Sequence, residues 1–342
     1  MPNQTETGSR QVSVLPPGSV GAASLSADPG RPPASAFLVL NFMAVYFLWG
    51  GTFFAMRLGV EAIPPLILAG IRHFTVGILF YPLLRWKTGQ KPNRRQWTTA
   101  AISGVLLMCL GNGGVCWAER TVPSGIAALL VATVTLWIVI VDWLRPGGVR
   151  PSARVLFGTA LGFAGMVILV GPMQIGKAGR VDPVGAIILI VASLAWACGS
   201  LVAKHGEMPS APLLGVAMQG LWGGGLLWVI GFCNGEVAQF HPSTVPLRSW
   251  LAVAYLLVCG SVIGFSSYLY ILKNSTAARV GTYAFVNPMV ALAIGWLLGG
   301  EGMSSRTALA AGVILTAVVM VISAPHRKAA ARPALAPLAD EA

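Results

Sequence analysis

The chain contains few charged residues for its length. Asp, Glu, Lys and Arg make up 10% of its 342 residues, and 55% of the residues are hydrophobic. An ordinary soluble domain has about 25% charged residues. A soluble fold of this composition would leave large apolar patches exposed to water. The composition therefore excludes a soluble globular protein and predicts an integral membrane protein.

Acidic residues are especially scarce. The chain has 11 Asp and Glu against 23 Lys and Arg, which gives a net charge of +12. The basic residues lie in the short gaps between apolar runs and do not cluster on one amphipathic element. This distribution is typical of membrane loops on the cytoplasmic side. It argues against nucleic acid as a partner.

The residues that support most catalytic and metal sites are also few. The four histidines are scattered, and no His-Glu-x-x-His, Gly-x-Ser-x-Gly or Walker-type glycine loop is present. The number of cysteines is odd, none forms a Cys-x-x-Cys pair, and most lie in apolar runs: Cys109, Cys116, Cys198, Cys233 and Cys259. We expect small buried side chains here rather than disulfides or a metal site. The sequence predicts no enzyme, no cofactor and no metal.

Ten apolar windows follow one another between the two ends of the chain. A helix needs roughly 20 residues to cross the hydrocarbon core, and each window is close to that length. The alternating pattern of an outer-membrane barrel is absent. We therefore predict an all-α protein with ten transmembrane helices, at about 37–56, 65–84, 97–118, 124–144, 155–171, 183–202, 211–232, 250–272, 280–299 and 307–323.

One pattern occurs twice in these windows. Leu-Trp-Gly-Gly-Thr at 48–52 has a counterpart at 195–200, and the polar-spotted run 111–117 has one at 264–270. A long apolar chain with such internal similarity is typical of a transporter built from two structural repeats, which places its substrate at the repeat interface.

The repeats divide the chain into parts. We predict a first repeat at 36–171 and a second at 183–323, joined by a linker at 172–182. Residues 1–35 and 324–342 are rich in small residues and proline, and we expect them to be disordered tails. Because each repeat has an odd number of helices, the two must have opposite orientations in the membrane.

The bias of basic residues predicts the orientation. With the N-terminus in the cytoplasm, sixteen Lys and Arg residues lie on the cytoplasmic side and six on the outer side, and Arg72 lies within a helix. Five of the sixteen are in the loop 85–96. Loops on the cytoplasmic side of a membrane protein carry an excess of Lys and Arg, so we expect both termini in the cytoplasm.

Several motifs resemble a known family. They are Trp-Gly-Gly-Thr at 49–52, Val-Pro-Ser-Gly-Ile-Ala-Ala at 122–128, Tyr-Ala-Phe-Val-Asn-Pro at 283–288 and Gly-Gly-Glu at 299–301. In this order and spacing they resemble the EamA branch of the drug/metabolite transporter superfamily, over roughly residues 40–322. The resemblance implies a ten-helix, inverted-repeat exporter of the inner (cytoplasmic) membrane, with a central cavity for amino acids, small metabolites or amphiphilic drugs.

The chain departs from this family pattern at three positions. Thr135 stands where the first repeat usually carries a proline, whereas Pro288 keeps the proline in the second. Glu301 has no equivalent after the fourth helix, and His73 replaces the usual phenylalanine after Arg72. These departures leave the symmetry of the two gates open.

Aromatic and polar residues near the middle of the predicted helices are the candidate substrate ligands. A buried Trp or Tyr needs a hydrogen-bond partner for its polar atom, and a neighbouring side chain or a ligand can supply it. For any single residue, helix packing is the alternative; for the set, we expect a cavity. The set is Trp49, Thr52, Asn112, Trp117, Trp196, Ser266, Ser267, Tyr270, Tyr283 and Asn287.

Arg72, Glu119 and Pro288 are the candidate gating or coupling residues. An arginine within a span normally faces the bundle interior, a cavity or a partner. Arg72 therefore either binds an anionic substrate group or latches a gate, or it ties helices together. Glu119 ends the third helix, either on a polar stripe that reaches inward or in an interfacial ion pair. Pro288 removes a backbone donor, and the freed carbonyl tends to face a cavity or another helix.

The sequence as a whole predicts a secondary transporter that works by alternating access. The alternatives are a membrane-embedded enzyme and a non-transporting scaffold. The expected partners are a small-molecule substrate and the lipid bilayer, with a homodimer left open. Every carboxylate lies at a helix end or outside the spans, and only His73 would titrate within one. We expect downhill, facilitated efflux, or else weak proton coupling through Glu119.

The predicted orientation has a direct test. Single cysteines are introduced at Lys91 and at Lys177 and probed in intact cells with a membrane-impermeant thiol reagent. Only the cysteine at position 177 should react above the background of the parent protein. Labelling at position 91 alone would reverse the orientation.

Overall fold

The computed structural model describes residues 35–122, 124–148, 150–170, 182–290 and 305–324, and within them the chain is helical without strands. The first half contains α1 (Ser35–Val60), α2 (Pro65–Thr88), α3 (Arg94–Gly104), η1 (Val105–Gly113), α4 (Gly114–Ala118), α5 (Ser124–Ala132), α6 (Val134–Leu144) and α7 (Ala153–Val170). The second contains α9 (Pro183–His205), α10 (Pro212–Cys233), α11 (Glu236–Gln239), η2 (Pro242–Thr244), α12 (Leu247–Tyr255), η3 (Leu256–Phe265), α13 (Ser266–Asn274), α14 (Ala277–Gly281) and α16 (Ser305–Ile322).

Six helices in the described residues are long and apolar enough to span a membrane: Ala36–Val60, Pro65–Thr88, Arg94–Ala118, Pro183–His205, Pro212–Cys233 and Leu247–Asn274. Three shorter apolar helices cover Leu129–Leu144, Ala153–Leu169 and Ala308–Ile322. The predicted ninth window, 280–299, is described only as far as residue 290 and is helical over 283–290. The all-α membrane fold is thus confirmed, whereas the count of ten extends beyond the described residues.

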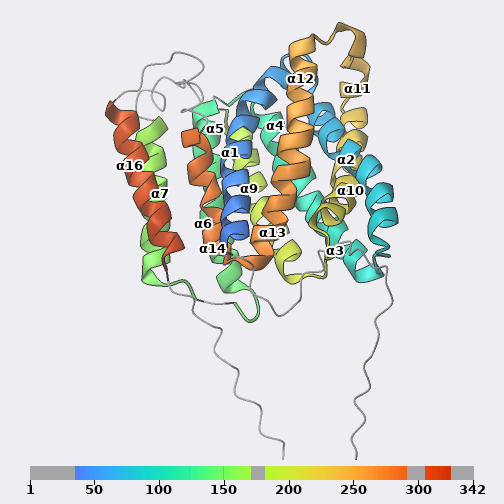
Figure 1. Ribbon diagram of the computed structural model, residues 1–342. Helices are drawn as coiled ribbons and strands as arrows, with labels where there is room; N and C mark the ends of the chain where they lie inside the picture. Colours follow the sequence, from blue (N-terminus) through green and yellow to red (C-terminus); the bar gives the residue numbers. More distant parts are fainter. Residues whose placement is uncertain (1–34, 123, 149, 171–181, 291–304, 325–342) are drawn as a thin grey trace, which may run out of the picture. The chain divides into compact units, whose positions relative to one another are not determined.

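Each half of the chain packs against the other in matching pairs. α2 packs against α10, and α7 runs beside α16 (Figure 1). The third helix of the first half, formed by α3, η1 and α4, contacts α9, and its counterpart, formed by α12, η3 and α13, contacts α1. α6 contacts α14. This pattern of contacts is the one expected when two similar repeats pack against each other.

The two counterpart helices share an irregularity. Each contains a π-helical segment in its middle, η1 in one and η3 in the other. Hydrogen bonds of the i→i+5 type widen the helix locally, and such segments occur frequently at functional sites. Asn112 lies in η1, and Phe265 ends η3, so both segments bring residues to the centre of the bundle.

Glycines allow α10 to approach its neighbours closely. A methyl group on Gly223 would overlap the carbonyl oxygen of Gly104, and one on Gly220 would overlap that of His73. Small residues of this kind let helix backbones come together in a membrane, where apolar burial between helices gives little driving force. The contact is reinforced by Gln219, whose amide nitrogen donates to the Ser103 hydroxyl at 2.7 Å.

The buried side chain of Glu236 caps the N-terminal end of α2. Glu236 is 5% exposed, and its Oε2 accepts hydrogen bonds from the backbone nitrogens of Leu66 at 2.9 Å and Ile67 at 3.3 Å. The first N–H groups of a helix have no partner within the helix and favour negative charge. Glu236, the first residue of α11, therefore supplies the cap that Pro64, at the N-cap position, does not provide.

The glycine contact predicts a sharp difference between two neighbouring substitutions. Gly223→Ala should lower the melting temperature and the yield of folded protein in detergent, because overpacking against the Gly104 backbone typically costs about 1–3 kcal/mol. Gly225→Ala is the matched control, because its methyl group would lie 3.4 Å from the Phe74 ring, an ordinary contact. Equal melting temperatures for the two variants would contradict the close approach.

Candidate substrate cavity

A cavity lies between the two halves, near the middle of the bundle. It contains about 610 Å³ of empty space, counting the part that is open to the surroundings. Residues of both halves line it: Trp49, Thr52, Met56, Arg72, Gly111, Asn112, Val115, Val131, Val134, Ala192, Ser193, Trp196, Phe265, Tyr283 and Asn287. Six of the ten predicted substrate ligands belong to this lining, together with Arg72.

Arg72 is the only charged residue among those lining this cavity. Its side chain is buried, at 3% exposure, and its Nε donates to the Ser261 hydroxyl at 2.8 Å. Gly260 makes room for the guanidinium, since a Cβ there would lie 2.7 Å from Nη2. Within the described residues no carboxylate lies within ion-pair distance of Arg72. The guanidinium therefore has donors to offer to a bound group.

An aromatic cluster forms one wall of the cavity. The Trp49 ring is edge-on to Trp196 at 5.7 Å and to Tyr283 at 5.2 Å between ring centroids. Phe265 lies 5.2 Å from Trp49 and 5.6 Å from Trp196. Tyr268 packs behind them, 5.1 Å from Trp49. Edge-to-face aromatic contacts of this kind stabilise a fixed arrangement of rings.

The polar atoms of the cluster are paired within the protein. Trp49 Nε1 donates to the Gly260 carbonyl at 2.9 Å, and Trp196 Nε1 donates to the Tyr268 hydroxyl at 3.2 Å. That hydroxyl also hydrogen-bonds with the Ser200 hydroxyl. These tryptophans therefore present their rings, rather than free N–H groups, to the cavity.

Four smaller polar residues also line the cavity: Thr52, Asn112, Ser193 and Asn287. Thr52 donates through Oγ1 to the Trp49 carbonyl of its own helix at 2.6 Å. The Asn287 amide donates to the carbonyls of Tyr46 and Tyr283, both at 3.1 Å. Asn112 is partly buried, and its Oδ1 is 3.8 Å from the Cys116 sulfur. Asn112 and Asn287 are thus among the neutral polar residues that line the cavity together with Arg72.

Four predicted ligands lie outside this lining: Trp117, Ser266, Ser267 and Tyr270. Ser266 donates to the Val262 carbonyl of its own helix, and Tyr270 packs edge-on against Phe37 at 4.9 Å. A serine that bonds back to its helix needs no partner from a cavity. Trp117 stacks beneath the Arg120 guanidinium at 5.0 Å.

Phe265 and Tyr268, which the sequence analysis did not name, lie beside Trp49 on the helix formed by η3 and α13. Phe265 follows Gly264 directly and lines the cavity, and Tyr268 is fully buried behind it. The sequence did contain a signal for them: Phe265 and Tyr268 are three positions apart, which puts the two aromatic rings on one face of a helix. A substrate role for Trp117, Ser266, Ser267 and Tyr270 stays a prediction.

The remaining coupling candidates, Glu119 and Pro288, do not line the central cavity, and neither does His73. Glu119 follows the last residue of the span Arg94–Ala118, and burial raises its pKa to about 7 although Arg57 lowers it. Pro288 is partly buried, and the helix continues through it to residue 290. His73 is buried with its ring edge-on to Phe265 at 5.6 Å, and its ring nitrogens have no partner among the described residues.

Thr135, which replaces the proline of the family pattern, joins the two halves. Its Oγ1 donates to the Gly281 carbonyl at 2.9 Å, and a Cβ on Gly281 would lie 3.2 Å from the threonine methyl group. A proline at position 135 would have no hydroxyl to make this bond. Glu301, the other departure, lies outside the described residues.

The fold and the cavity agree with what comparison with known proteins shows. Residues 36–171 and 183–323 both match the EamA-like transporter family. The chain therefore belongs to the EamA-like transporter family, with two copies of the family domain, and it is a multi-pass protein of the inner membrane.

Its relatives include named transporters. The chain is 37% identical over 300 residues to the "Uncharacterized inner membrane transporter YedA" of Escherichia coli K12, covering 87% of this chain and 94% of the relative. It is 24% identical over 304 residues to the "Probable amino-acid metabolite efflux pump" of the same organism, covering 84% and 95%. A solved crystal structure of a protein 21% identical to the chain has the same fold, with a TM-score of 0.69 over 84% of this chain and 99% of the other.

The raised pKa of Glu119 predicts a pH-dependent stability. The folded protein holds this proton more tightly than the unfolded chain, whose carboxyl has a pKa near 4.5. Stability contributed by the neutral carboxyl is therefore lost as the pH rises from about 4.5 through about 7. Glu119→Gln keeps a neutral side chain at every pH, so wild type should lose melting temperature relative to the variant between these values.

Melting temperatures of both proteins in one detergent, measured across this pH range, check the prediction. Other titrating groups are common to both proteins and cancel in the difference. A difference that is constant with pH would show that the pKa of Glu119 is the same in the folded protein as in the unfolded chain.

Proposed function

We propose that this chain is a secondary exporter of small metabolites, amino acids or amphiphilic drugs bearing a carboxylate or similar anionic group. The single observation that carries the proposal is Arg72, a buried cation without an ion-pair partner among the described residues, in the lining of a cavity between the repeats. A carboxylate accepts paired hydrogen bonds from a guanidinium. The nearby Trp and Phe rings suit the apolar part of such a molecule.

The proposed topology follows from the repeats. It has ten transmembrane helices in two inverted sets of five and both termini in the cytoplasm. The matching helix pairs and the paired π-helical segments support the inverted repeat. Three residues that the charge bias assigns to the cytoplasmic side, Arg145, Lys204 and Lys273, line one cavity at the same end of the helices. That grouping supports one common side for the segments that carry them.

Alternating access would open this cavity to one side at a time. Hydrogen bonds around it join the two repeats. The Tyr46 hydroxyl bonds to the Thr282 hydroxyl at 2.6 Å, and the Thr135 hydroxyl donates to the Gly281 carbonyl. Such contacts are the ones that rocking of one repeat against the other must break and remake. The relative named as an amino-acid metabolite efflux pump supports an exporter of amino-acid-like molecules.

Facilitated, downhill efflux is the proposed energetic mode, with weak proton coupling through Glu119 as the alternative. Purified protein in proteoliposomes, tested against a panel of metabolites with and without an imposed pH gradient, separates the two. Downhill flux that is the same with and without the gradient supports facilitated efflux. Concentration of substrate only under a pH gradient would contradict facilitated efflux and favour coupling.

The role of Arg72 predicts a selective loss of transport. Arg72→Gln should reduce the flux of carboxylate-bearing substrates by about tenfold or more, because a charge-assisted hydrogen bond contributes roughly 1.5–3 kcal/mol. Arg72→Lys keeps the charge but loses the paired geometry and should retain part of the flux. The melting temperature and the reconstituted amount of each variant control for folding. Wild-type flux in a folded Arg72→Gln protein would refute the proposed recognition.

A further inference from the structure

A second, larger cavity lies at the end of the helices that the charge bias assigns to the cytoplasm. It contains about 1170 Å³ of empty space, counting the part that is open to solvent. The ends of α6, α9, α13 and α16 and the starts of α7 and α14 surround it. It shares no lining residue with the central cavity.

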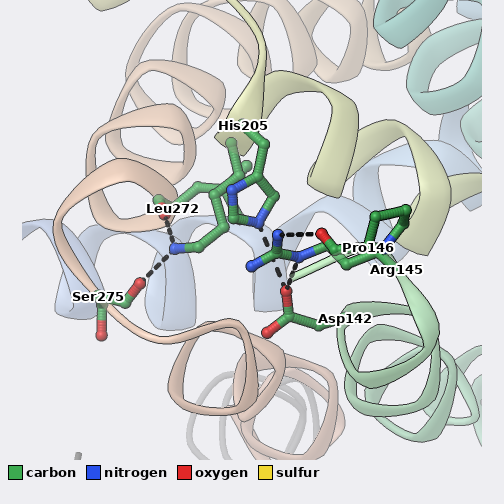
Figure 2. Close-up of polar contacts among 7 residues, drawn as sticks. Asp142, Arg145, Pro146, His205, Leu272 and Ser275 are labelled. Atoms are coloured by element: carbon green, nitrogen blue, oxygen red, sulfur yellow. Dashed lines mark hydrogen bonds and ion pairs between the residues drawn. The ribbon is translucent and has the colours of Figure 1, made fainter. Parts of the chain in front are cut away.

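The lining of this cavity is strongly basic. Four cationic residues line it, against one carboxylate: Arg145, Arg150, Lys204, Lys273 and Asp142. Figure 2 shows that two of the cations are engaged. Arg145 donates to Asp142 at 2.7 Å, and Lys204 donates to the carbonyls of Leu272 and Ser275. The carboxylate is therefore already compensated by Arg145, with His205 a further 3.4 Å contact.

The other two cations have no anionic partner in the described part of the chain. Arg150 lies 6.0 Å from the centre of the Trp143 ring, and Lys273 forms no ion pair. Together with Lys204, whose carbonyl partners leave its charge uncancelled, they give the cavity an excess of positive charge. This excess surrounds one cavity, partly open to solvent, which an anion can enter.

The rest of the lining is suited to a group that is polar at one end. Ser152, Asn274 and Thr276 supply side-chain hydrogen-bonding groups beside the cations. Val139, Val155 and Val321 form an apolar wall on another part of the cavity. Beside it, Trp143 and Leu144 are exposed, at 44% and 72%, as residues facing lipid would be.

We propose that this cavity binds a phosphate-bearing anion, held by Arg150 and Lys273. A phosphate group carries several acceptor oxygens, which suit the fork of an arginine and the point charge of a lysine. Basic pockets between helices on the cytoplasmic side bind anionic lipid head groups. The phosphate belongs either to an anionic phospholipid or to a soluble phosphate compound. This site is separate from the proposed transport function.

Native mass spectrometry of the full-length protein, released from detergent, tests the proposal. The probes are phosphatidylglycerol, phosphatidylcholine, glycerol 3-phosphate and inorganic phosphate. The test variant is Arg150→Gln/Lys273→Gln, which keeps the Arg145–Asp142 pair and the Lys204 contacts. Arg154→Gln is the control, because Arg154 is exposed at the same end of α7 but does not line the cavity.

Wild type should bind phosphatidylglycerol or the soluble phosphates in preference to phosphatidylcholine. The double variant should bind the preferred probe about tenfold more weakly or worse, since a basic residue near anionic lipid contributes about 1 kcal/mol. Arg154→Gln should bind as wild type does. Preference for phosphatidylglycerol assigns the site to a lipid, and preference for the soluble phosphates assigns it to a soluble compound.

Two outcomes would overturn the site. One is wild-type binding of all four probes without preference, which needs no variant and so does not depend on the folding of any. The other is an equal loss in Arg154→Gln and in the double variant, which would mean that general surface charge attracts the anion.

Discussion

The absence of water from a lipid bilayer is the constraint on which this structure depends. Every backbone N–H and C=O within the hydrocarbon region must find its partner inside the protein, and unsatisfied groups cost several kcal/mol each. The described residues meet this requirement with helices, and with side chains where helices begin. Glu236, at the start of α11, accepts hydrogen bonds from the first N–H groups of α2, and Asp182 caps α9 as its N-cap residue.

The same constraint explains where polar side chains occur. Most serines and threonines of the spans return their hydroxyl to a nearby carbonyl of their own helix, as Ser266 and Thr52 do. Other polar side chains form hydrogen bonds to a different helix, among them Tyr46, Thr135 and Gln219. Arg72 differs from both groups. It is buried with one hydrogen bond among the described residues and the rest of its donors at a cavity.

The proposed alternating access requires a bundle that is well packed and yet movable. Glycine contacts fix α10 against α2 and the third helix. Around the central cavity the contacts are aromatic edges and single hydrogen bonds, which can be exchanged at modest cost. The π-helical segments lie beside the cavity in both counterpart helices. The rigid and the adaptable parts of the molecule are therefore built from different residue types.

Much of the fold could be predicted from the sequence, because apolar length and loop charge act locally along the chain. The sequence by itself determined the all-α membrane class, the two repeats and the family. It also singled out Arg72, because a cation within an apolar window has few alternatives to a polar interior site. The side of the helix formed by η3 and α13 that packs against Trp49 could not be predicted in this way. Ser266, Ser267 and Tyr270 looked suitable by polarity, yet Phe265 and Tyr268 face the cluster around Trp49. Only the tertiary structure decided this, because a hydroxyl can be satisfied within its own helix, whereas the packing of rings depends on which helices meet.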